Sequence, residues 1–292
     1  MKNLFYISIT LMMLVSCNLQ PEEKITWNVQ PSPEMLVVES IITNEMKQQV
    51  IHLTKTNPYF DTITPKGVSN AIVEVNDGTI TYSFTESKDS AGWYFSTQAF
   101  AGKQKTLYQL SIQLSSPINS LTGYTAQSLL PDGLPIDSMT CEIYKMPQFN
   151  QQGNNNKDKD TTILAVYYFG KEPDEAENFY FTKVFRNGKL LYTNPKEYPY
   201  FTIAKQNQSF THIIGFNKDV EGNDSIRFQL YTISSDYYHY LEAVQNIDIS
   251  GNAYSMSGPP ANAVGNVESG KALGYFLAAY VSEKKAKAID KR

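Results

Sequence analysis

Short segments in which apolar and polar residues alternate follow one another closely along the first half of this 292-residue chain. "QQVIHLTKT" (48–56) and "LYQLSIQL" (107–114) are clear examples. Successive side chains of a β-strand point to opposite faces, so this alternation predicts half-buried strands. Asn76-Asp77-Gly78 falls between two such segments and predicts a hairpin turn. No helical pattern separates the segments, which favours an antiparallel β-sandwich of the immunoglobulin or fibronectin kind over residues 35–131.

The longest alternating segment also predicts core positions. We expect the side chains of Leu107, Leu110, Ile112 and Leu114 to lie in the core of the sandwich. Tyr108 lies where a tyrosine corner would place its hydroxyl against nearby backbone.

A junction is expected at "LPDGLPIDS" (130–138), and residues 132–292 are predicted to form a second β-rich domain. Asn187-Gly188 predicts a hairpin there, and the polar stretch 147–160 predicts a loop. One helix is expected from Ser234 or Ser235 onward, because apolar residues then recur on one face. That face comprises Tyr237, Tyr240, Leu241 and Val244. A last strand at 272–282 and a solvated basic tail at 283–292 complete the expected domain.

The amino terminus predicts lipid anchoring. Lys2 supplies the short positive region of a signal peptide, and the apolar run 4–15 has the length of its core. "LVSC" (14–17) resembles the bacterial lipobox. We therefore expect residues 1–16 to be a signal peptide, Cys17 to carry the acyl chains and residues 17–34 to form a tether. Residue 18 is Asn and not the Asp that often holds lipoproteins at the inner membrane, which favours the outer membrane. The pair Glu22-Glu23 resembles the short acidic export signal of surface lipoproteins, which favours the cell surface.

Charge and motif content argue against several classes of function. A formal net charge of −4 lacks the basic surface that nucleic acid requires, so no nucleic-acid partner is expected. The histidines have no metal-binding spacing, and the stretch from Asn156 lacks the glycine and glutamate of a calcium loop. No phosphate-binding loop or serine-hydrolase elbow occurs. Cys141 alternates with apolar neighbours and is expected in a buried strand. We expect no catalytic residues, metal or cofactor.

Aromatic residues are the remaining candidates for a binding role. The chain has 20 Tyr and 15 Phe, and tyrosine combines a flat apolar face with a polar tip. "YTNPKEYPYF" (192–201) concentrates them around two prolines in an expected loop. We therefore predict that Tyr192, Tyr198, Tyr200 and Phe201 form a ligand- or partner-binding surface.

Several segments in order resemble one family, the Bacteroidetes outer-membrane lipoproteins catalogued as domain of unknown function 4249. The resemblance is carried by "LVVESIIT", "VSNAIVEVNDG", "GWYF", "LYQLSIQ", "YTAQSLLP", "ISSDYYHYLEAV" and "PPANAVGNVESGKALGYFLAAY". It implies an outer-membrane lipoprotein, commonly encoded beside a TonB-dependent receptor, in a family without established catalytic residues. By analogy with other receptor–lipoprotein pairs, such a protein would help the receptor capture its ligand.

These observations together predict a non-enzymatic, lipid-anchored outer-membrane protein that assists a TonB-dependent receptor in nutrient uptake. A structural or adhesive surface protein is one alternative. A hydrolase of surface glycans or peptides is another, because the pair of carboxylates that such an enzyme uses has no sequence signature.

Overall fold

The first half of the chain folds into antiparallel strands that turn one apolar face inward, as the alternating sequence dictates. A computed structural model of the chain describes residues 33–57, 64–149, 155–171, 177–204, 210–217, 220–250, 262–267 and 272–291. The strands of the first half are β1 (Leu36–Thr43), β2 (Val50–Lys55), β3 (Ile72–Asn76), β4 (Thr81–Glu86), β5 (Trp93–Ser96), β6 (Thr106–Ile118) and β7 (Leu121–Leu130).

The second half adds longer strands and one α-helix among the described residues. Its strands are β8 (Ile136–Phe149), β9 (Asn155–Gly170), β10 (Glu177–Arg186), β11 (Lys189–Leu190), β12 (Tyr200–Ala204), β13 (Phe210–Asn217), β14 (Ser225–Ile233) and β15 (Ala272–Lys291). A short 3₁₀ helix, η1, covers Pro195–Glu197, and the α-helix, α2, covers Ser235–Ser250. No helix in the described part of the chain combines the length and apolar character needed to span a membrane.

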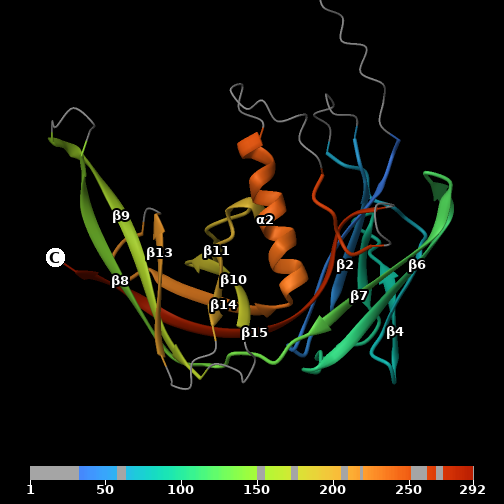
Figure 1. The fold of residues 1–292 in the computed structure, drawn as a ribbon, viewed down its shortest axis with the longest axis horizontal. Helices are drawn as coiled ribbons and strands as arrows, with labels where there is room; N and C mark the ends of the chain where they lie inside the picture. Colours follow the sequence, from blue (N-terminus) through green and yellow to red (C-terminus); the bar gives the residue numbers. More distant parts are fainter. Residues whose placement is uncertain are drawn as a thin grey trace, which may run out of the picture. The chain divides into compact units, whose positions relative to one another are not determined.

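All the described strands belong to one hydrogen-bonded sheet, and β15 connects its two halves. The main path is β11-β10-β14-β15-β1-β2-β5-β4-β3-β6-β7, while β8, β9, β12 and β13 branch from it. β15 pairs in parallel with β1 and, at its far end, with β8, and it pairs antiparallel with β14. Figure 1 shows β15 running from the strands of the first half to the β8–β9 hairpin, with α2 standing on the sheet between them.

Three clusters of buried apolar residues lie on this sheet. The amino-terminal core is built by β1–β7 with the first part of β15, and it includes Leu36, Tyr94, Tyr108, Tyr124 and Phe276. The carboxyl-terminal core includes Cys141, Leu164, Tyr180, Phe216 and Phe228. The aromatic cluster lies under α2 and includes Phe181, Tyr198, Tyr231, Tyr237, Leu241 and Tyr275. β15 contributes residues to all three clusters.

The amino-terminal core is closed by contacts between β7 and β15. The backbone N–H of Ala278 donates to Oγ of Ser128 over 2.8 Å. Asn266 Nδ2 donates to the carbonyl of Gln127 at 2.7 Å and to that of Phe276 at 2.8 Å. These bonds satisfy backbone groups that lie outside the regular strand pairing, so the curled first half encloses its core.

The prediction of a mainly β chain with a sandwich-like amino-terminal half and one helix is confirmed. The chain divides into residues 1–32, which lie outside the described residues, and Pro33–Arg292, which holds every described element. The domain boundaries proposed from the sequence stay predictions. The hairpins at Gly78 and at Asn187-Gly188 form, with the positive φ angles that such turns require.

The predicted helix is also confirmed, including its start and its buried face. Ser234 Oγ accepts a hydrogen bond from the N–H of Tyr237 at 3.4 Å, which is the capping geometry expected there. Tyr237 and Leu241 are buried, and Tyr240 and Val244 are half-buried. Tyr108 accepts a hydrogen bond from the N–H of Lys103 at 2.8 Å, as a tyrosine corner would.

Three local predictions were wrong. Leu107 is 45% exposed, because it stands one residue out of phase with Leu110, Ile112 and Leu114, which are buried. The expected loop at 147–160 is partly strand, since β8 extends to Phe149 and β9 begins at Asn155. The expected basic tail is also strand, because β15 continues to Lys291 along β14 and β8. Ala288, buried between exposed neighbours, shows the alternation of this last segment.

Candidate ligand-binding site

A cavity of about 260 Å³ lies beneath α2, at the edge of the aromatic cluster. Its walls come from β1, β10, β15, α2 and the segment that holds η1. Tyrosine rings dominate these walls: Tyr198 precedes β12, Tyr237 and Tyr240 belong to α2, and Tyr275 belongs to β15. An engineered apolar cavity of about 150 Å³ holds benzene, so this one has room for a ring-sized ligand.

The tyrosines contact one another ring to ring and so form a continuous aromatic surface. The centroids of Tyr237 and Tyr275 are 4.8 Å apart in an edge-on arrangement, and those of Tyr240 and Tyr275 are 5.0 Å apart. Phe181 stacks on Tyr231 with centroids 4.4 Å apart. Such pairs stabilise packing by about 0.5–1.5 kcal/mol each beyond the burial of their area. The tyrosine walls of the cavity and the neighbouring pair of Phe181 and Tyr231 are therefore held by mutual ring contacts.

Lys183 and Lys196 both line this cavity, and Lys183 is the one that lies against the aromatic rings. Its Nζ lies 5.3 Å from the ring centroids of Tyr198 and Tyr231 and 5.9 Å from that of Phe181. No carboxylate or hydrogen-bond acceptor among the described residues pairs with it. Its contacts with the described residues are therefore with aromatic faces.

The register of the sheet explains why Lys183 stands on this face. Phe181 pairs with Tyr231 and Lys183 with Gln229, so both β10 side chains point toward the face covered by α2. Thr182 and Val184, which alternate with them, are buried on the other side. A polar residue at this strand position is thus forced among aromatic neighbours.

Burial in these surroundings, together with the smaller effect of the positive charge of Lys47, lowers the pKa of Lys183 from 10.5 to about 8. Burial also raises the pKa of Tyr275 to about 12 and the pKa of Tyr237 still further. At neutral pH the tyrosines are therefore neutral and Lys183 is positively charged.

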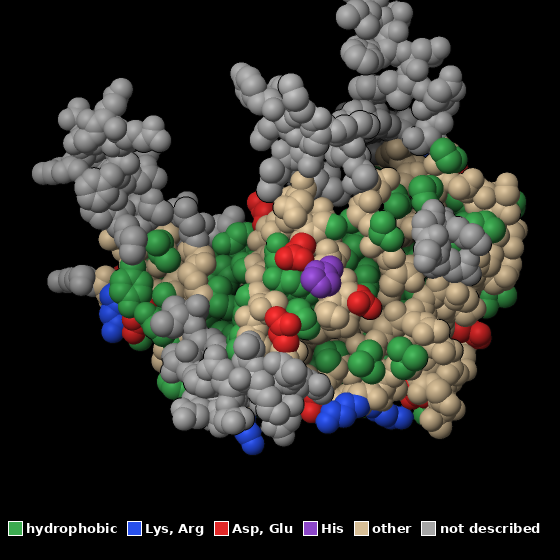
Figure 2. Space-filling model, viewed as in Figure 1, with side chains coloured by type: hydrophobic (Ala, Val, Ile, Leu, Met, Phe, Trp, Pro, Cys, Tyr) green, Lys and Arg blue, Asp and Glu red, His purple; other side chains and the backbone are tan. Residues whose placement is uncertain are grey.

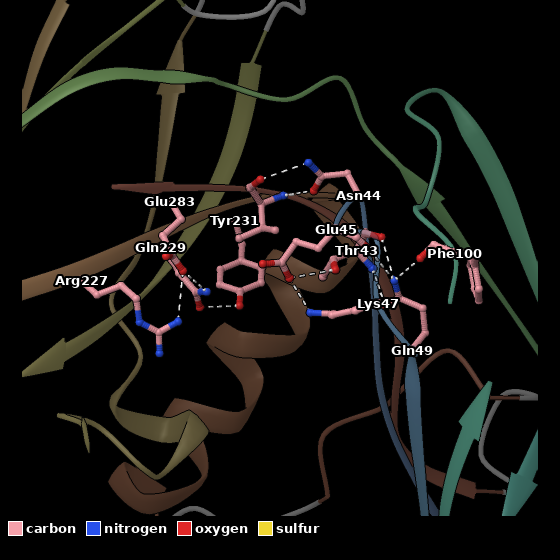
Figure 3. Close-up of polar contacts among 11 residues, drawn as sticks. Thr43, Asn44, Glu45, Lys47, Gln49, Phe100, Arg227, Gln229, Tyr231 and Glu283 are labelled. Atoms are coloured by element: carbon pink, nitrogen blue, oxygen red, sulfur yellow. Dashed lines mark hydrogen bonds and ion pairs between the residues drawn. The ribbon is translucent and has the colours of Figure 1, made fainter. Parts of the chain in front are cut away.

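A hydrogen-bonded network beside the cavity fixes the loop between β1 and β2 onto β15 (Figure 3). Asn44 donates to the carbonyl of Val281 at 3.1 Å and accepts from its N–H at 2.6 Å. Tyr231 donates to Gln229 at 2.8 Å, and Gln229 donates to Glu283 at 2.8 Å. These bonds hold Tyr231 in place and draw Glu283 into contact with Gln229. The ion pair between Glu45 and Lys47 lies in the same loop.

Acidic and apolar side chains surround α2 on the face that carries it, whereas Lys and Arg gather at the lower rim (Figure 2). Glu39 lines the cavity and has a side chain that is 61% exposed. It also pairs with His52 at 3.1 Å. The cavity thus has a half-buried cation, Lys183, and a more exposed carboxylate in its walls.

The structure separates the four aromatic residues predicted as a binding surface. Tyr198 is buried and lines the cavity. Tyr200 begins β12 and packs edge-on against Tyr238 of α2, while Phe201 points to the opposite face and packs 5.4 Å from Tyr180. Tyr192 lies between two clusters, 5.9 Å from Phe216. Their role in binding stays a prediction.

The two cysteines have different standing. Cys17, the predicted lipid-attachment residue, lies outside the described residues. Cys141 is fully buried in β8 as predicted, and burial raises the pKa of its thiol to about 12. Such a thiol is protonated at neutral pH and therefore unreactive. Within the described part of the chain, no cluster of His, Cys, Asp and Glu is arranged to hold a metal ion.

Sequence reasoning missed Lys183 and the aromatic residues around it on β10, β14 and β15. One signal was available, because "FYFTKVF" (179–185) places a single lysine inside an otherwise apolar strand. A charge in a buried strand needs a partner or a function.

Comparison with known proteins gives one family. The family model described as "Domain of unknown function (DUF4249)" matches residues 22–285. No curated protein matches the chain at a significant level. Among solved structures, a chain described as "Cytokine receptor complex - Crystal form 1A" is similar over 70% of this chain and 86% of its own length, with 9% identity and a TM-score of 0.25. A TM-score this low does not establish a shared fold.

Proposed function

The chain belongs to the family described as Domain of unknown function (DUF4249), and from this premise we propose that it is a lipid-anchored outer-membrane protein. In this proposal it has no catalytic activity of its own. It captures a small ligand and passes it to a TonB-dependent receptor, in whose nutrient uptake it takes part.

The cavity beneath α2 is the observation that carries the ligand-capture part of this proposal. Small-molecule sites are concave and mostly apolar, with a few polar groups that orient the ligand. The tyrosine walls and the single unpaired ammonium of Lys183 have this composition. A protein that served only as an adhesive scaffold would not need a desolvated lysine at such a position.

The lipobox supports the anchoring part. Cys17 follows directly on an apolar run that is too short to cross a bilayer, which needs about 20 apolar residues. Each buried methylene of an acyl chain contributes about 0.8 kcal/mol, so two or three chains would hold the protein at the membrane. The pair Glu22-Glu23 directs the proposal to the cell surface.

Metabolic labelling with radioactive palmitate tests the anchor. The native chain should incorporate label and fractionate with the outer membrane, and Cys17→Ser should lose both properties. Cys141→Ser is the matched control, because it removes the other cysteine, which is buried, and should keep the label. A native chain without label would overturn the anchoring.

Affinity purification tests the receptor partnership. The tagged, acylated chain extracted in mild detergent should bring down a TonB-dependent receptor reproducibly. When the chromosomal receptor gene is replaced by a copy expressed at a low level, the amount of receptor recovered should fall. Repeated isolation of the acylated chain without any receptor would overturn this part of the proposal.

A further inference from the structure

We infer that the cavity beneath α2 binds an organic molecule with a single carboxylate, which pairs with Lys183 while its apolar body lies on the tyrosine rings. The inference deepens the proposed function and rests on it only in taking this cavity as the ligand site. It concerns the chemistry of the ligand and requires neither a membrane nor a receptor.

The first argument is the unpaired charge of Lys183. Removing an ammonium from water is costly unless an anion or several hydrogen bonds replace the lost solvent. The three rings beside Nζ compensate in part, since a cation–π contact contributes about 0.5–2 kcal/mol. They do not supply a counter-charge. A ligand carboxylate in the cavity would supply it.

The alternative explanation is that Lys183 only covers apolar surface with its methylene stem. Lysines that do so hold the ammonium in water at the protein surface. The ammonium of Lys183 instead lies beside the rings of Phe181, Tyr231 and Tyr198, which are 0%, 5% and 9% exposed. Lys183 itself is half-buried and lines the cavity, so its ammonium is held beside aromatic faces at the cavity wall.

The second argument concerns the body of the ligand. Next to Lys183 the cavity is lined by the rings of Tyr198, Tyr237, Tyr240 and Tyr275. The hydroxyls of Tyr198, Tyr237 and Tyr240 make no hydrogen bond to another described residue, so they can serve a ligand. An aromatic or aliphatic body of ring size matches both the volume and this lining.

The third argument limits the charge of the ligand. Glu39 lines the same cavity, the charge of the whole chain is −4, and acidic side chains surround α2 (Figure 2). These groups repel a polyanion such as an organic phosphate. A single carboxylate, alone or balanced by an ammonium near Glu39, fits the charges present. The other cations near Lys183 are Lys47, which is paired with Glu45, and Lys196, which also lines the cavity.

Calorimetric titration of the full chain, purified in detergent, tests the inference with defined probes. The probes are 3-phenylpropanoate, its neutral isostere 3-phenylpropanamide, and inorganic phosphate. The native chain should bind the acid about tenfold or more tightly than the amide, because a hydrogen bond to a charged group contributes about 1.5–3 kcal/mol. Phosphate should bind more weakly than the acid.

Variants test whether Lys183 causes the preference for the acid over the amide. Lys183→Met keeps the length and apolar stem of the side chain and should bind acid and amide equally. Lys183→Arg restores the charge and should regain part of the preference for the acid. Lys189→Met removes an exposed lysine of the neighbouring strand β11 and should behave like the native chain. Should Lys183→Met not fold, Lys183→Gln takes its place.

Four outcomes would overturn the inference: no binding of the acid by the native chain, equal binding of acid and amide, tighter binding of phosphate, or an unchanged preference in the variant without the charge. These outcomes are separate from those of the proposed function. If the chain prefers the acid over the amide but incorporates no palmitate, the inference about the cavity stands and only the proposed lipid anchor is overturned.

Discussion

The amino-terminal core and the aromatic cluster both contain buried tyrosines, but they use them differently. In the amino-terminal core each hydroxyl is bound to backbone: Tyr94 donates to the carbonyl of Val68 at 2.8 Å, and Tyr124 donates to that of Ile118 at 3.0 Å. In the aromatic cluster the hydroxyls of Tyr198 and Tyr240 have no partner among the described residues. The first region is closed and satisfied, and the second leaves polar groups available.

This difference indicates where stability and binding reside. A buried polar group that has its hydrogen bonds contributes to a unique, rigid core. The hydroxyls of Tyr198 and Tyr240 are not among the described buried polar atoms that lack a partner, so water or a ligand can reach them. Substitutions in the amino-terminal core should therefore change folding, whereas substitutions around Lys183 should change binding more than folding.

Truncation of a core tyrosine should have the largest effect on stability. Tyr94→Ala removes a fully buried ring and should lower the free energy of unfolding by about 3–5 kcal/mol. Tyr240→Ala, at the half-buried wall of the cavity, should cost about 1 kcal/mol or less. Urea unfolding followed by circular dichroism measures both. Equal losses would mean that the two regions do not differ as described.

A side chain at Gly274 should disturb the strand that joins the two regions. Gly274 has φ = +82°, and a Cβ atom there would lie 2.1 Å from the carbonyl oxygen of Val38 on the paired strand β1. Gly274→Ala should therefore destabilise the protein by about 2–4 kcal/mol and weaken ligand binding as well, because this residue also lines the cavity. Gly78→Ala is the control, because Gly78 has a similar φ of +86° but open space around it. The difference between the two variants gives the cost of the clash without that of the backbone strain.

The stability of the native chain should depend on pH through Lys183. Its pKa is lowered to about 8 by burial, from an ordinary value of 10.5, so the folded chain releases this proton before the unfolded chain does. Between these two pH values the unfolded chain binds more protons, and the free energy of unfolding should rise with pH by roughly 1–3 kcal/mol. Lys183→Met should lack this rise.

The free energy of unfolding of the native chain and of Lys183→Met is measured with urea at pH 8.0 and pH 9.5. The difference between the two chains isolates the contribution of Lys183 from that of the tyrosines. The charged groups near Lys183 that take part in the balance are Lys47, Glu45, Glu39 and Lys196. A native chain whose stability falls relative to the variant over this range would contradict the desolvation of Lys183.

Removal of single hydroxyls should give the smallest effects and the most direct test of the comparison. Tyr94→Phe leaves the carbonyl of Val68 and the N–H of Ala71 without their partner and should cost about 1–2 kcal/mol. Tyr198→Phe removes a hydroxyl that has no partner among the described residues and should change stability by less than about 0.5 kcal/mol. Thermal melts of both variants against the native chain provide the measurement.

The local structure of this protein follows closely from its residues. Alternation predicts the strands, Gly78 and Asn187-Gly188 predict the turns, and Ser234 with the tyrosines behind it predicts the helix. The errors arose where composition outweighed alternation. The basic residues near the carboxyl end suggested a tail, although the buried Ala288 between exposed neighbours continues the period of a strand.

The candidate site was less accessible to such reasoning. Four aromatic residues close together in the sequence suggested a surface, but Tyr200 and Phe201 are neighbours in a strand and therefore point to opposite faces. The residues that do meet at the cavity come from five separate elements. Only the pairing of β10 with β14, and of β15 with β1, brings them together.

The sequence by itself determined the mainly β character of this protein, its turns and its single described helix, because these depend on neighbours within a few residues. It also displayed Lys183 as a charge inside an apolar strand. Only the tertiary structure decided that this charge has aromatic faces beside it and no ion-pair partner among the described residues. The identity of a side chain's surroundings depends on strand order and register over more than two hundred residues, which no local pattern encodes.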